Sequence, residues 1–317
     1  MAQPMNYIIT DIRHRALKNL HESLATGYSE SHYLTSRILY TKTRGNFNQE
    51  LNTCIGAIRP RISYETHSLD AIILNKKDPI EIADNLQKSG GYVVENLKLK
   101  ASIYEEFCNA LDSIDSSCTD NGQKSSRSFI SNWSVIRKLR LPQILISSRT
   151  LKAVADAYLG CNSFVSLAVA WKTRPADRTS ELLNQDALQF HFDCDHNRFL
   201  KVFVYLDDVD EKTGPHVAIP FTGGSYGFET LHPTICEDRR ISNLEIVNHG
   251  LNPIYYCGEK GTLILGDTHN FHRGTPVYPG RSRYIFQLQF SDSIFGAKLT
   301  HAACDIIEMN YLHLETR

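Results

Sequence analysis

The hydrophobic pattern of this chain changes its period once, close to Gly160. Upstream of this point apolar residues recur at helical spacing, as in the series Ile103, Phe107, Leu111 and Ile114. Downstream, apolar and polar residues alternate with a period of two, which is the pattern of half-buried strands. Helices followed by many antiparallel strands predict an α+β chain with a β-sandwich or jelly-roll core and flanking N-terminal helices.

Local signals set the limits of several expected elements. A helix should begin after Asp78, because the sequence DPIE combines an N-cap side chain, a first-turn proline and a glutamate three residues after the cap. Gly90 and Gly91 should end this helix, and Gly160 should end another over residues 151–159. Residues 120–128 are expected to form a polar loop. The expected strands are residues 92–94, 164–171, 187–192, 199–206, 262–265 and 284–290, with 216–219 as a shorter candidate.

The length of 317 residues fits one large domain with extensions, or two modest domains. We expect residues 1–70 to be an N-terminal extension packed on a core domain over residues 71–300, and residues 301–317 to be a C-terminal tail. Two long polar stretches, 172–186 and 221–260, separate strands, and such long loops usually serve as lids or binding loops. Part of the 221–260 insertion is expected to fold over the site when substrate binds. The alternative is an insertion packed on the outside of the core.

Composition narrows the class of protein. Hydrophobic residues make up 42% and charged residues 22% of the chain, as in a globular protein with a sizeable core. The formal net charge of -1 gives no global field toward nucleic acid or an anionic membrane. No apolar run reaches the ~18 residues of a membrane helix. The N-terminus lacks the layout of an export signal and the cysteines form no CxxC pair, which favours a cytoplasmic protein with reduced thiols.

The run Gln189-Phe190-His191-Phe192-Asp193 carries the most informative pair of side chains. On a strand, residues two apart point to the same face, so His191 and Asp193 would lie side by side. One imidazole and one carboxylate are two thirds of a facial 2-His-1-carboxylate triad, which leaves open positions on Fe(II). The pair alone is a weak signal, since the run 313–315 (HLE) matches it as well, with nothing downstream to complete a site.

A second histidine and an arginine follow in the order that such a site needs. Residues 266–274 contain His269 and His272, and Arg283 opens the last expected strand eleven residues after His272. This spacing favours His272 over His269 as the ligand that completes the triad. Arginine presents a planar pair of donors to a carboxylate, which lysine cannot match. Arg283 is therefore the expected carboxylate-binding group, with Arg281 as the alternative.

Taken in order, these segments resemble the phytanoyl-CoA dioxygenase family of Fe(II)/2-oxoglutarate oxygenases. The resemblance covers roughly residues 78–293, about two thirds of the chain. It begins with DPIEIADNLQKSGGYVVEN and the helix end AYLG at residues 157–160. It continues through residues 191–195 (HFDCD), 199–209 (FLKVFVYLDDV), 213–216 (TGPH), 261–263 (GTL), 267–268 (DT), 272–276 (HRGTP) and Arg283.

This resemblance implies a double-stranded β-helix, a jelly roll of the cupin-like kind that holds iron in its mouth. It implies iron ligation by His191, Asp193 and His272. It also implies that Arg283 binds the distal carboxylate of 2-oxoglutarate, which would bind iron together with O2.

The chain departs from the family at two places. Residues 219–223 (IPFTG) stand where the family often has Pro-Gly-Ser-His, and Gly274 stands where a hydroxyl residue often helps to hold 2-oxoglutarate. Tyr205 or Thr275 could supply that contact. Gln189, on the same strand face as His191, is a further pocket candidate.

Other polar residues near these segments are weaker candidates. Asp195 and His196 lie beyond the strand end, His216 follows a Gly-Pro turn and is expected to be structural, and Cys194 should point away from the metal. Basic residues in the long loops could bind an anionic substrate; they are Lys172, Arg174, Arg178, Arg239 and Arg240.

The expected function is oxidation of a small-molecule metabolite, coupled to decarboxylation of 2-oxoglutarate to succinate and CO2. Hydroxylation is the default, while desaturation, cyclisation or epoxidation would use the same ligands. Members of the family act on acyl-CoA thioesters, amino acids, amino sugars and secondary metabolites, so natural product biosynthesis is one context. Halogenation is disfavoured, because halogenases of this type lack the carboxylate that Asp193 provides. The alternatives are a catalytically silent jelly roll that binds a ligand, and a cupin-like metal isomerase or hydrolase.

Overall fold

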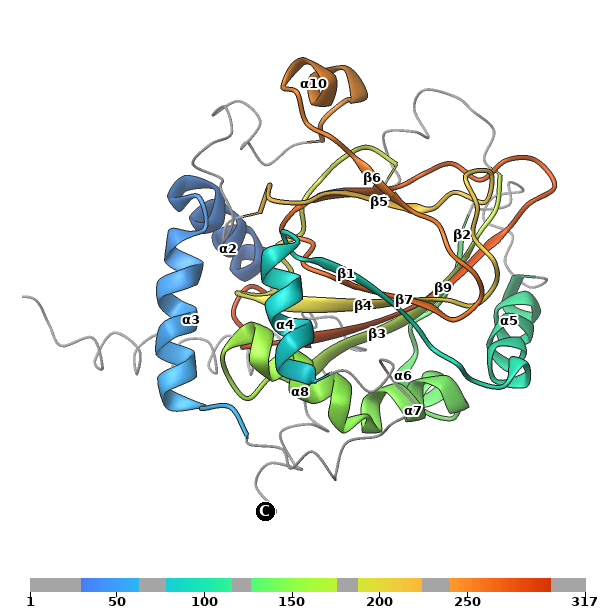
Figure 1. Cartoon of the computed structure of the whole chain (residues 1–317), viewed down its shortest axis with the longest axis horizontal. Helices are drawn as coiled ribbons and strands as arrows, with labels where there is room; N and C mark the ends of the chain where they lie inside the picture. The colour runs from blue at the N-terminus through green and yellow to red at the C-terminus, as the bar shows by residue number, and fades with distance from the viewer. Residues whose placement is uncertain (1–29, 63–77, 116–126, 176–187, 224–239, 298–317) are drawn as a thin grey trace, which may run out of the picture.

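The structure is a computed structural model that describes residues 30–62, 78–115, 127–175, 188–223 and 240–297. Two antiparallel sheets face each other, and helices cover the outside of the larger one (Figure 1). This arrangement confirms the mixed helix and antiparallel-sheet class. The described helices are α2 (Glu30–Thr43), α3 (Asn46–Ile58), α4 (Pro79–Lys88), α5 (Ala101–Asp115), α6 (Trp133–Ile136), α7 (Arg140–Ser147), α8 (Arg149–Leu159) and α10 (Asn243–Asn248).

The larger sheet has six strands in the order β1-β7-β4-β9-β3-β2, and the smaller sheet has three in the order β6-β5-β8. Strands adjacent in the sheets lie far apart in the sequence, as β4 and β9 do, so the larger sheet depends on long-range pairing. The strands are β1 (Tyr92–Asn96), β2 (Arg127–Ile130), β3 (Phe164–Thr173), β4 (Phe199–Tyr205), β5 (His216–Ile219), β6 (Ile254–Tyr256), β7 (Thr262–Gly266), β8 (Phe271–Gly274) and β9 (Arg283–Ser291).

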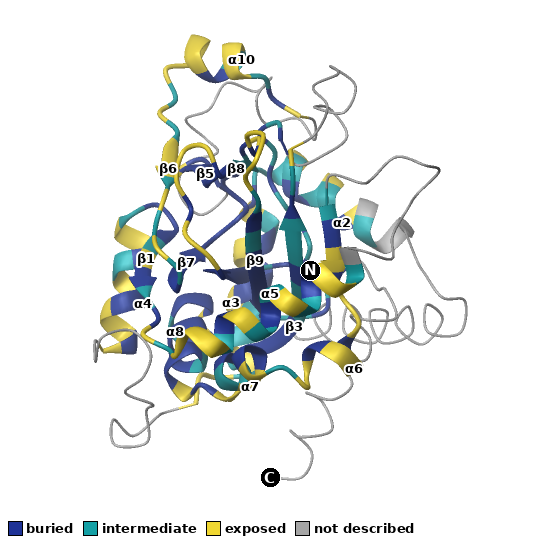
Figure 2. Cartoon of the chain, turned by 90° about the vertical axis from the view of Figure 1, so that its right-hand side faces the viewer, coloured by how far each residue is buried: buried dark blue, intermediate teal, exposed yellow. Residues whose placement is uncertain are grey.

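Alternation along β4 shows how the larger sheet divides its two faces. Leu200, Val202 and Val204 point outward into the main core, which they form together with the helices. Phe203 and Tyr205 point inward, toward the smaller sheet. Figure 2 shows the same division on the helices, where buried and exposed stripes alternate around each axis. The inward face of the larger sheet is therefore the surface on which a site between the sheets can form.

Two of the expected helix limits, at Asp78 and Gly160, are present, and the structure adds a cap at Ser148 that was not expected. The Asp78 carboxylate accepts a hydrogen bond from the amide of Ile80 at 2.9 Å, as an N-cap does. Ser148 caps α8 by accepting from the amide of Leu151. Gly160 ends that helix with φ of 72°, a left-handed conformation that favours glycine. Local capping chemistry thus fixes where these helices begin and end.

Helix α3, which falls within the expected N-terminal extension, contacts the core through buried amides. Asn48 and Asn197 exchange two side-chain to carbonyl hydrogen bonds. The Asn52 amide donates to the carbonyl of Leu159 and to the carboxylate of Asp292. These contacts tie α3 to the end of α8 and to one end of the β4–β9 pair, where β4 begins and β9 finishes.

Several sequence expectations were wrong in detail. Residues 188–192 form only two isolated bridges, Phe190 to Ile241 and His191 to His272, in place of a strand over 187–192. The chain turns at residues 188–189 and bends again after 194, so no ladder can extend. The expected 120–128 loop ends in strand β2, which starts at Arg127 because that edge pairs with β3.

The 221–260 insertion is also not a plain loop. It contains helix α10 and strand β6, and β6 pairs with β5 in the smaller sheet. Residues 224–239 of the insertion, and residues 176–186 of the other long stretch, lie outside the described residues. Closure of either segment over substrate stays a prediction.

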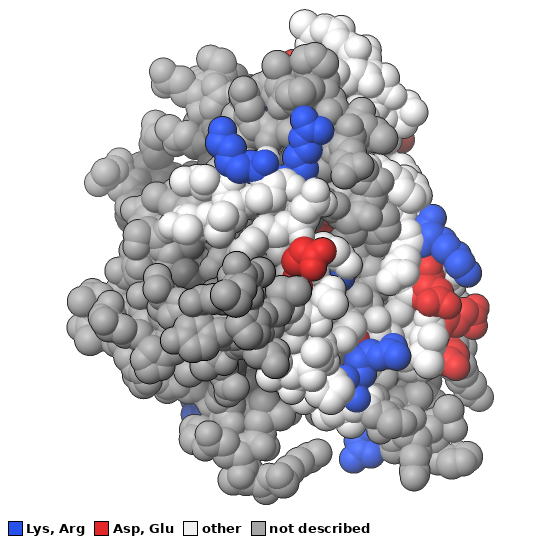
Figure 3. Space-filling view, turned by 90° about the vertical axis from the view of Figure 1, so that its left-hand side faces the viewer, with Lys and Arg blue, Asp and Glu red and all other residues white. Residues whose placement is uncertain are grey.

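Charges of both signs are interspersed on the described part of the surface in Figure 3, which agrees with the near-zero net charge. Among the described helices, none has the length and hydropathy to cross a lipid bilayer.

Candidate metal centre

Three side chains converge between the two sheets: His191, Asp193 and His272, which together form the candidate metal-binding group. One ligand atom of each lies within 4.8 Å of the others, and no other such group of three occurs among the described residues. The Nε2 of His272 is 3.2 Å from Oδ2 of Asp193, and the Nε2 of His191 is 3.9 Å from Oδ1. The amide of each histidine donates to the carbonyl of the other, at 3.0 and 2.8 Å. This two-residue bridge joins a bent segment to strand β8 and sets the spacing of the imidazoles.

Both imidazoles are oriented for metal binding. The Nδ1 of His191 is 2.9 Å from the carbonyl of Gln189, and the Nδ1 of His272 is 3.0 Å from the carbonyl of Asn270. A carbonyl only accepts, so each Nδ1 carries the hydrogen and each Nε2 presents a lone pair. Burial, and the nearby His272, lower the pKa of His191 to about 3, which keeps this ring neutral.

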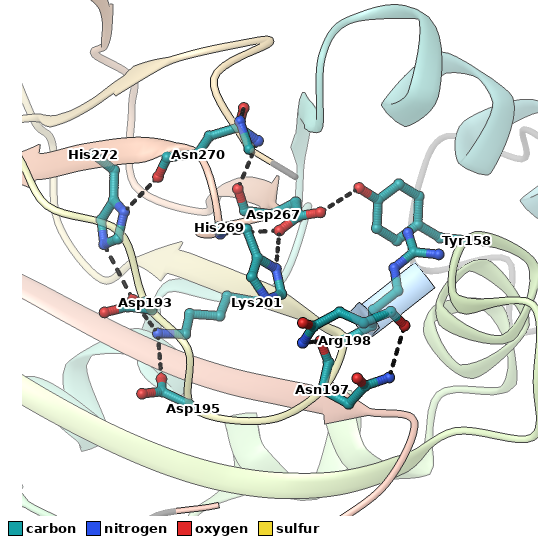
Figure 4. A network of polar contacts seen from close by, with 12 residues as sticks. Tyr158, Asp193, Asp195, Asn197, Arg198, Lys201, Asp267, His269, Asn270 and His272 are labelled. Carbon is teal, nitrogen blue, oxygen red and sulfur yellow. Dashed lines mark hydrogen bonds and ion pairs between the residues drawn. The ribbon is translucent and has the colours of Figure 1, made fainter. Parts of the chain in front are cut away.

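Lys201 lies inside the same group, which sequence analysis did not foresee. Its Nζ is 2.6 Å from Oδ2 of Asp193 and 2.9 Å from Oδ2 of Asp195 (Figure 4). Burial by itself would raise the pKa of Asp193, but Lys201 and the histidines hold it well below its ordinary value. The one signal in the sequence was a lysine in the otherwise apolar and aromatic run FLKVFVYL.

These side chains open onto a cavity of about 250 Å³ between the sheets. Its floor is the inward face of the larger sheet, and its walls combine cations with aromatic and aliphatic groups. Lining residues beyond the metal-binding group include Arg127, Phe129, Trp171, Lys201, Phe203, His216, Arg273, Arg283, Ile285 and Gln287.

Arg283 lies in this cavity with unsatisfied donors. The residue is 2% exposed, and its Nε and Nη1 have no hydrogen-bond partner among the residues that the structure describes. Burial lowers the pKa of its guanidinium to about 10. Thr173 is opposite Arg283 in the β3–β9 register, and its buried hydroxyl also lacks a partner. Buried donors without acceptors are costly, so this end of the cavity is suited to an anionic ligand.

Arg127 extends the same row by one strand. It pairs with Thr173 across the β2–β3 ladder, so Arg127, Thr173 and Arg283 share one face of the sheet. No pattern in the run DNGQKSSRS marked this arginine, because its position depends on pairing with β3.

Three further candidates are not among the described residues that line the cavity: Tyr205, Thr275 and Gln189. The Tyr205 hydroxyl donates to the carbonyl of Tyr256 and accepts from the amide of His216. The Thr275 hydroxyl donates to the carbonyl of Pro215. Gln189 contributes its backbone carbonyl to His191.

Arg281, the alternative carboxylate-binding residue, lies outside. Its side chain is 54% exposed and is 4.0 Å from the carboxylate of Asp210. The loop cations are dispersed: Lys172 pairs with Asp112 and Arg174 donates to Ser128. Arg178 and Arg239 lie outside the described residues.

His216 is closer to the metal-binding group than expected. Its ring centroid is 5.7 Å from that of His272, in a stacked arrangement, and its buried Nε2 has no partner. Burial, and the nearby His272, hold the pKa of His216 well below its ordinary value. His216 therefore contributes a neutral, polar wall to the cavity.

His269 belongs to a different network. Its Nδ1 is 2.8 Å from Oδ1 of Asp267, and the Tyr158 hydroxyl donates to Oδ2 at 2.7 Å (Figure 4). The His269 ring packs against those of Tyr40 and Phe199. This network joins α8 to the turn between β7 and β8, so His269 has a structural role.

The Asp267 network makes stability depend on pH. Burial alone would raise the pKa of Asp267, but His269 and its other partners lower it to about 2, from 3.8. A carboxyl with a depressed folded pKa stabilises the fold above its unfolded pKa and loses this contribution as pH falls through the folded value. The contribution totals roughly 2 kcal/mol, of which about 1 kcal/mol should be lost between about pH 5 and pH 3.

Urea denaturation of wild type and Asp267→Asn across this pH range measures the effect. We expect the stability difference between the two to shrink as the pH falls. A difference that stays constant with pH would contradict the assignment.

No protein-family model matches the chain, and no curated protein does. Solved structures do match. AviO1 from Streptomyces viridochromogenes is 14% identical, with 68% of this chain and 96% of that chain covered and a TM-score of 0.46. The epimerase SnoN in complex with Fe3+, α-ketoglutarate and nogalamycin RO is 11% identical, with 68% and 83% covered and a TM-score of 0.47. EctD from S. alaskensis with 2-oxoglutarate and 5-hydroxyectoine is 19% identical, with 74% and 82% covered and a TM-score of 0.45. These similarities concern the fold alone, so the chemistry of the site depends on the residues that form it.

Proposed function

We propose that this chain is a mononuclear non-haem Fe(II)- and 2-oxoglutarate-dependent oxygenase acting on a small organic molecule. One observation carries the proposal. A cavity between two antiparallel sheets has two imidazoles and one carboxylate on its wall, together with a buried arginine whose donors lack acceptors.

The metal-binding group fits Fe(II). His191 and His272 each present an Nε2 lone pair, and Asp193 supplies an anionic oxygen. Two histidines and one carboxylate on one face leave positions open, as non-haem Fe(II) oxygenases require. When bound, iron supplies a centre that binds the cosubstrate and O2 together and drives oxidation of the substrate. The Asp193 carboxylate occupies the place that a halide would need, so we propose oxygenation and not halogenation.

The Arg283 end fits 2-oxoglutarate. A dicarboxylate that reaches from the metal toward Arg283 would give its Nε and Nη1 the acceptors they lack. The Thr173 hydroxyl lies on the same face and offers one more donor. SnoN and EctD hold α-ketoglutarate or 2-oxoglutarate in their solved structures, and we assign the same cosubstrate to this chain.

We assign the two-sheet core to the double-stranded β-helix, in the manner of the phytanoyl-CoA dioxygenase family. Support comes from the ordered segments HFDCD, FLKVFVYLDDV and HRGTP, which lie on β4, on β8 and next to them. Hydroxylation is the expected outcome. Phe129 and Trp171, whose ring centroids are 6.4 Å apart, give the cavity an apolar side for the body of the substrate.

A spectroscopic titration tests the proposal. Under anaerobic conditions, protein with Fe(II) and 2-oxoglutarate should show the weak visible charge-transfer band of a chelated 2-oxo acid, and succinate should be released on admission of air. Succinate release should then rise with the correct member of a metabolite library.

Absence of the band with Fe(II) bound would exclude 2-oxoglutarate. It would favour a silent binding protein or a metal isomerase or hydrolase that needs no cosubstrate.

A further inference from the structure

A lysine at a site for a divalent cation needs an explanation, because two positive charges compete for one carboxylate. Lys201 is 5% exposed, on the inward face of β4, where it lies opposite Gln289 and Gly266. Its ammonium is held on two sides, by Asp193 and by Asp195. Asp195 lies two residues after Asp193 and so anchors Lys201 from beside the metal-binding group.

The contact is specific to one carboxylate oxygen. Lys201 donates to Oδ2 of Asp193, and His272 is also nearest to that oxygen. Within the part of the chain that the structure describes, no hydrogen bond is made to Oδ1. The two oxygens of Asp193 are therefore not equivalent.

We propose that Lys201 is a positioning residue that occupies Oδ2 of Asp193, so that this carboxylate binds the metal through Oδ1 alone. The inference rests on the proposed function, and it concerns how many positions on the metal stay open. A six-coordinate ion with three single-atom protein ligands has three positions left, which a chelating 2-oxo acid and O2 fill. A carboxylate that binds through both oxygens would remove one of them.

Loss of Lys201 should therefore affect metal and cosubstrate in opposite directions. Without the competing ammonium, a divalent cation should bind more tightly, by about five- to tenfold. The second oxygen of Asp193 would then become a ligand, and 2-oxoglutarate should bind more weakly by about tenfold or more. A residue that only supports the fold would weaken both.

Mn(II), an O2-inert probe, tests this in the full-length protein. Electron paramagnetic resonance titration gives the Mn(II) affinity, and line broadening by 17O-labelled water gives the number of metal-bound waters. The variants are Lys201→Met and, in case that variant fails to fold, Lys201→Gln. Arg273→Met is the matched control, because Arg273 lines the same cavity and lies over the Phe190 ring at 4.5 Å, whereas the ion-pair partners of Asp193 among the described residues are Lys201 and the two histidines.

We expect the Lys201 variants to bind Mn(II) more tightly with one water fewer, and to bind 2-oxoglutarate more weakly. Arg273→Met, which also removes one positive charge, should keep the wild-type water count. Suppose that wild type binds Mn(II) and 2-oxoglutarate but both Lys201 variants keep the wild-type number of metal-bound waters. This result would overturn the proposed role of Lys201 and leave the proposed function intact. A wild type that binds Mn(II) but takes no 2-oxoglutarate would overturn the proposed function, while the water count would still decide what Lys201 does. A wild type that binds no metal would overturn both.

Discussion

Alanine at His191, Asp193 or His272 should abolish turnover. Each substitution removes one of the three proposed metal ligands, and loss of an outer partner of a ligand already costs about 10- to 100-fold. We therefore expect activity to fall by more than about 100-fold in each case. The measurements are Fe(II) binding under anaerobic conditions and succinate release. Circular dichroism of the apoproteins should stay unchanged, since these side chains lie on the cavity wall.

His269→Ala is the matched control for the third ligand. His269 is a histidine three residues before His272, but its Nδ1 is bonded to Asp267 in a separate buried network. We expect this variant to bind Fe(II) like wild type and to melt at a lower temperature, because it leaves Asp267 buried with fewer partners. An inactive His269→Ala together with an active His272→Ala would show that the wrong histidine was assigned.

Arg283→Lys should raise the 2-oxoglutarate requirement and leave the Fe(II) requirement nearly unchanged. Lysine keeps the charge but replaces a two-pronged contact with a point contact. A charge-assisted hydrogen bond is worth roughly 1.5–3 kcal/mol, so the apparent affinity for 2-oxoglutarate should fall by about 10- to 100-fold. Titration of the charge-transfer band measures this without dependence on substrate.

Arg281→Lys provides the comparison, because it changes the same residue type two positions earlier. Its side chain is 54% exposed, whereas Arg283 is buried. We expect no change in 2-oxoglutarate affinity. A loss at Arg281 with none at Arg283 would move the carboxylate contact to the cavity rim.

Much of the candidate site could be anticipated because its signals are short-range. His191 and Asp193 are two residues apart, and the spacing from His272 to Arg283 distinguished His272 from His269. In the structure β8 begins at Phe271, which packs into an apolar cluster, so His272 faces the opposite side, toward the cavity. The strand expected over residues 187–192, which contains His191, was wrong, because this segment forms only two isolated bridges. The His191 and Asp193 side chains still lie together, because the backbone hydrogen bonds between His191 and His272 keep this segment extended.

The features that could be predicted from the residues alone are local: the change from helical to strand period, the Asp78 cap, the Gly160 helix end and the order of the candidate metal-binding motifs. Each depends on residues within a few positions of one another, so the chain expresses it wherever the segment lies. Two features emerge from the folded chain: Arg127 lies in one row with Arg283, and Lys201 donates a hydrogen bond to one oxygen of Asp193. The first relation depends on which strands pair and in which register, and strand pairing joins residues as far apart in the sequence as Thr173 and Arg283. The second depends on the bends between Asp193 and β4, which bring Lys201 back to the carboxylate.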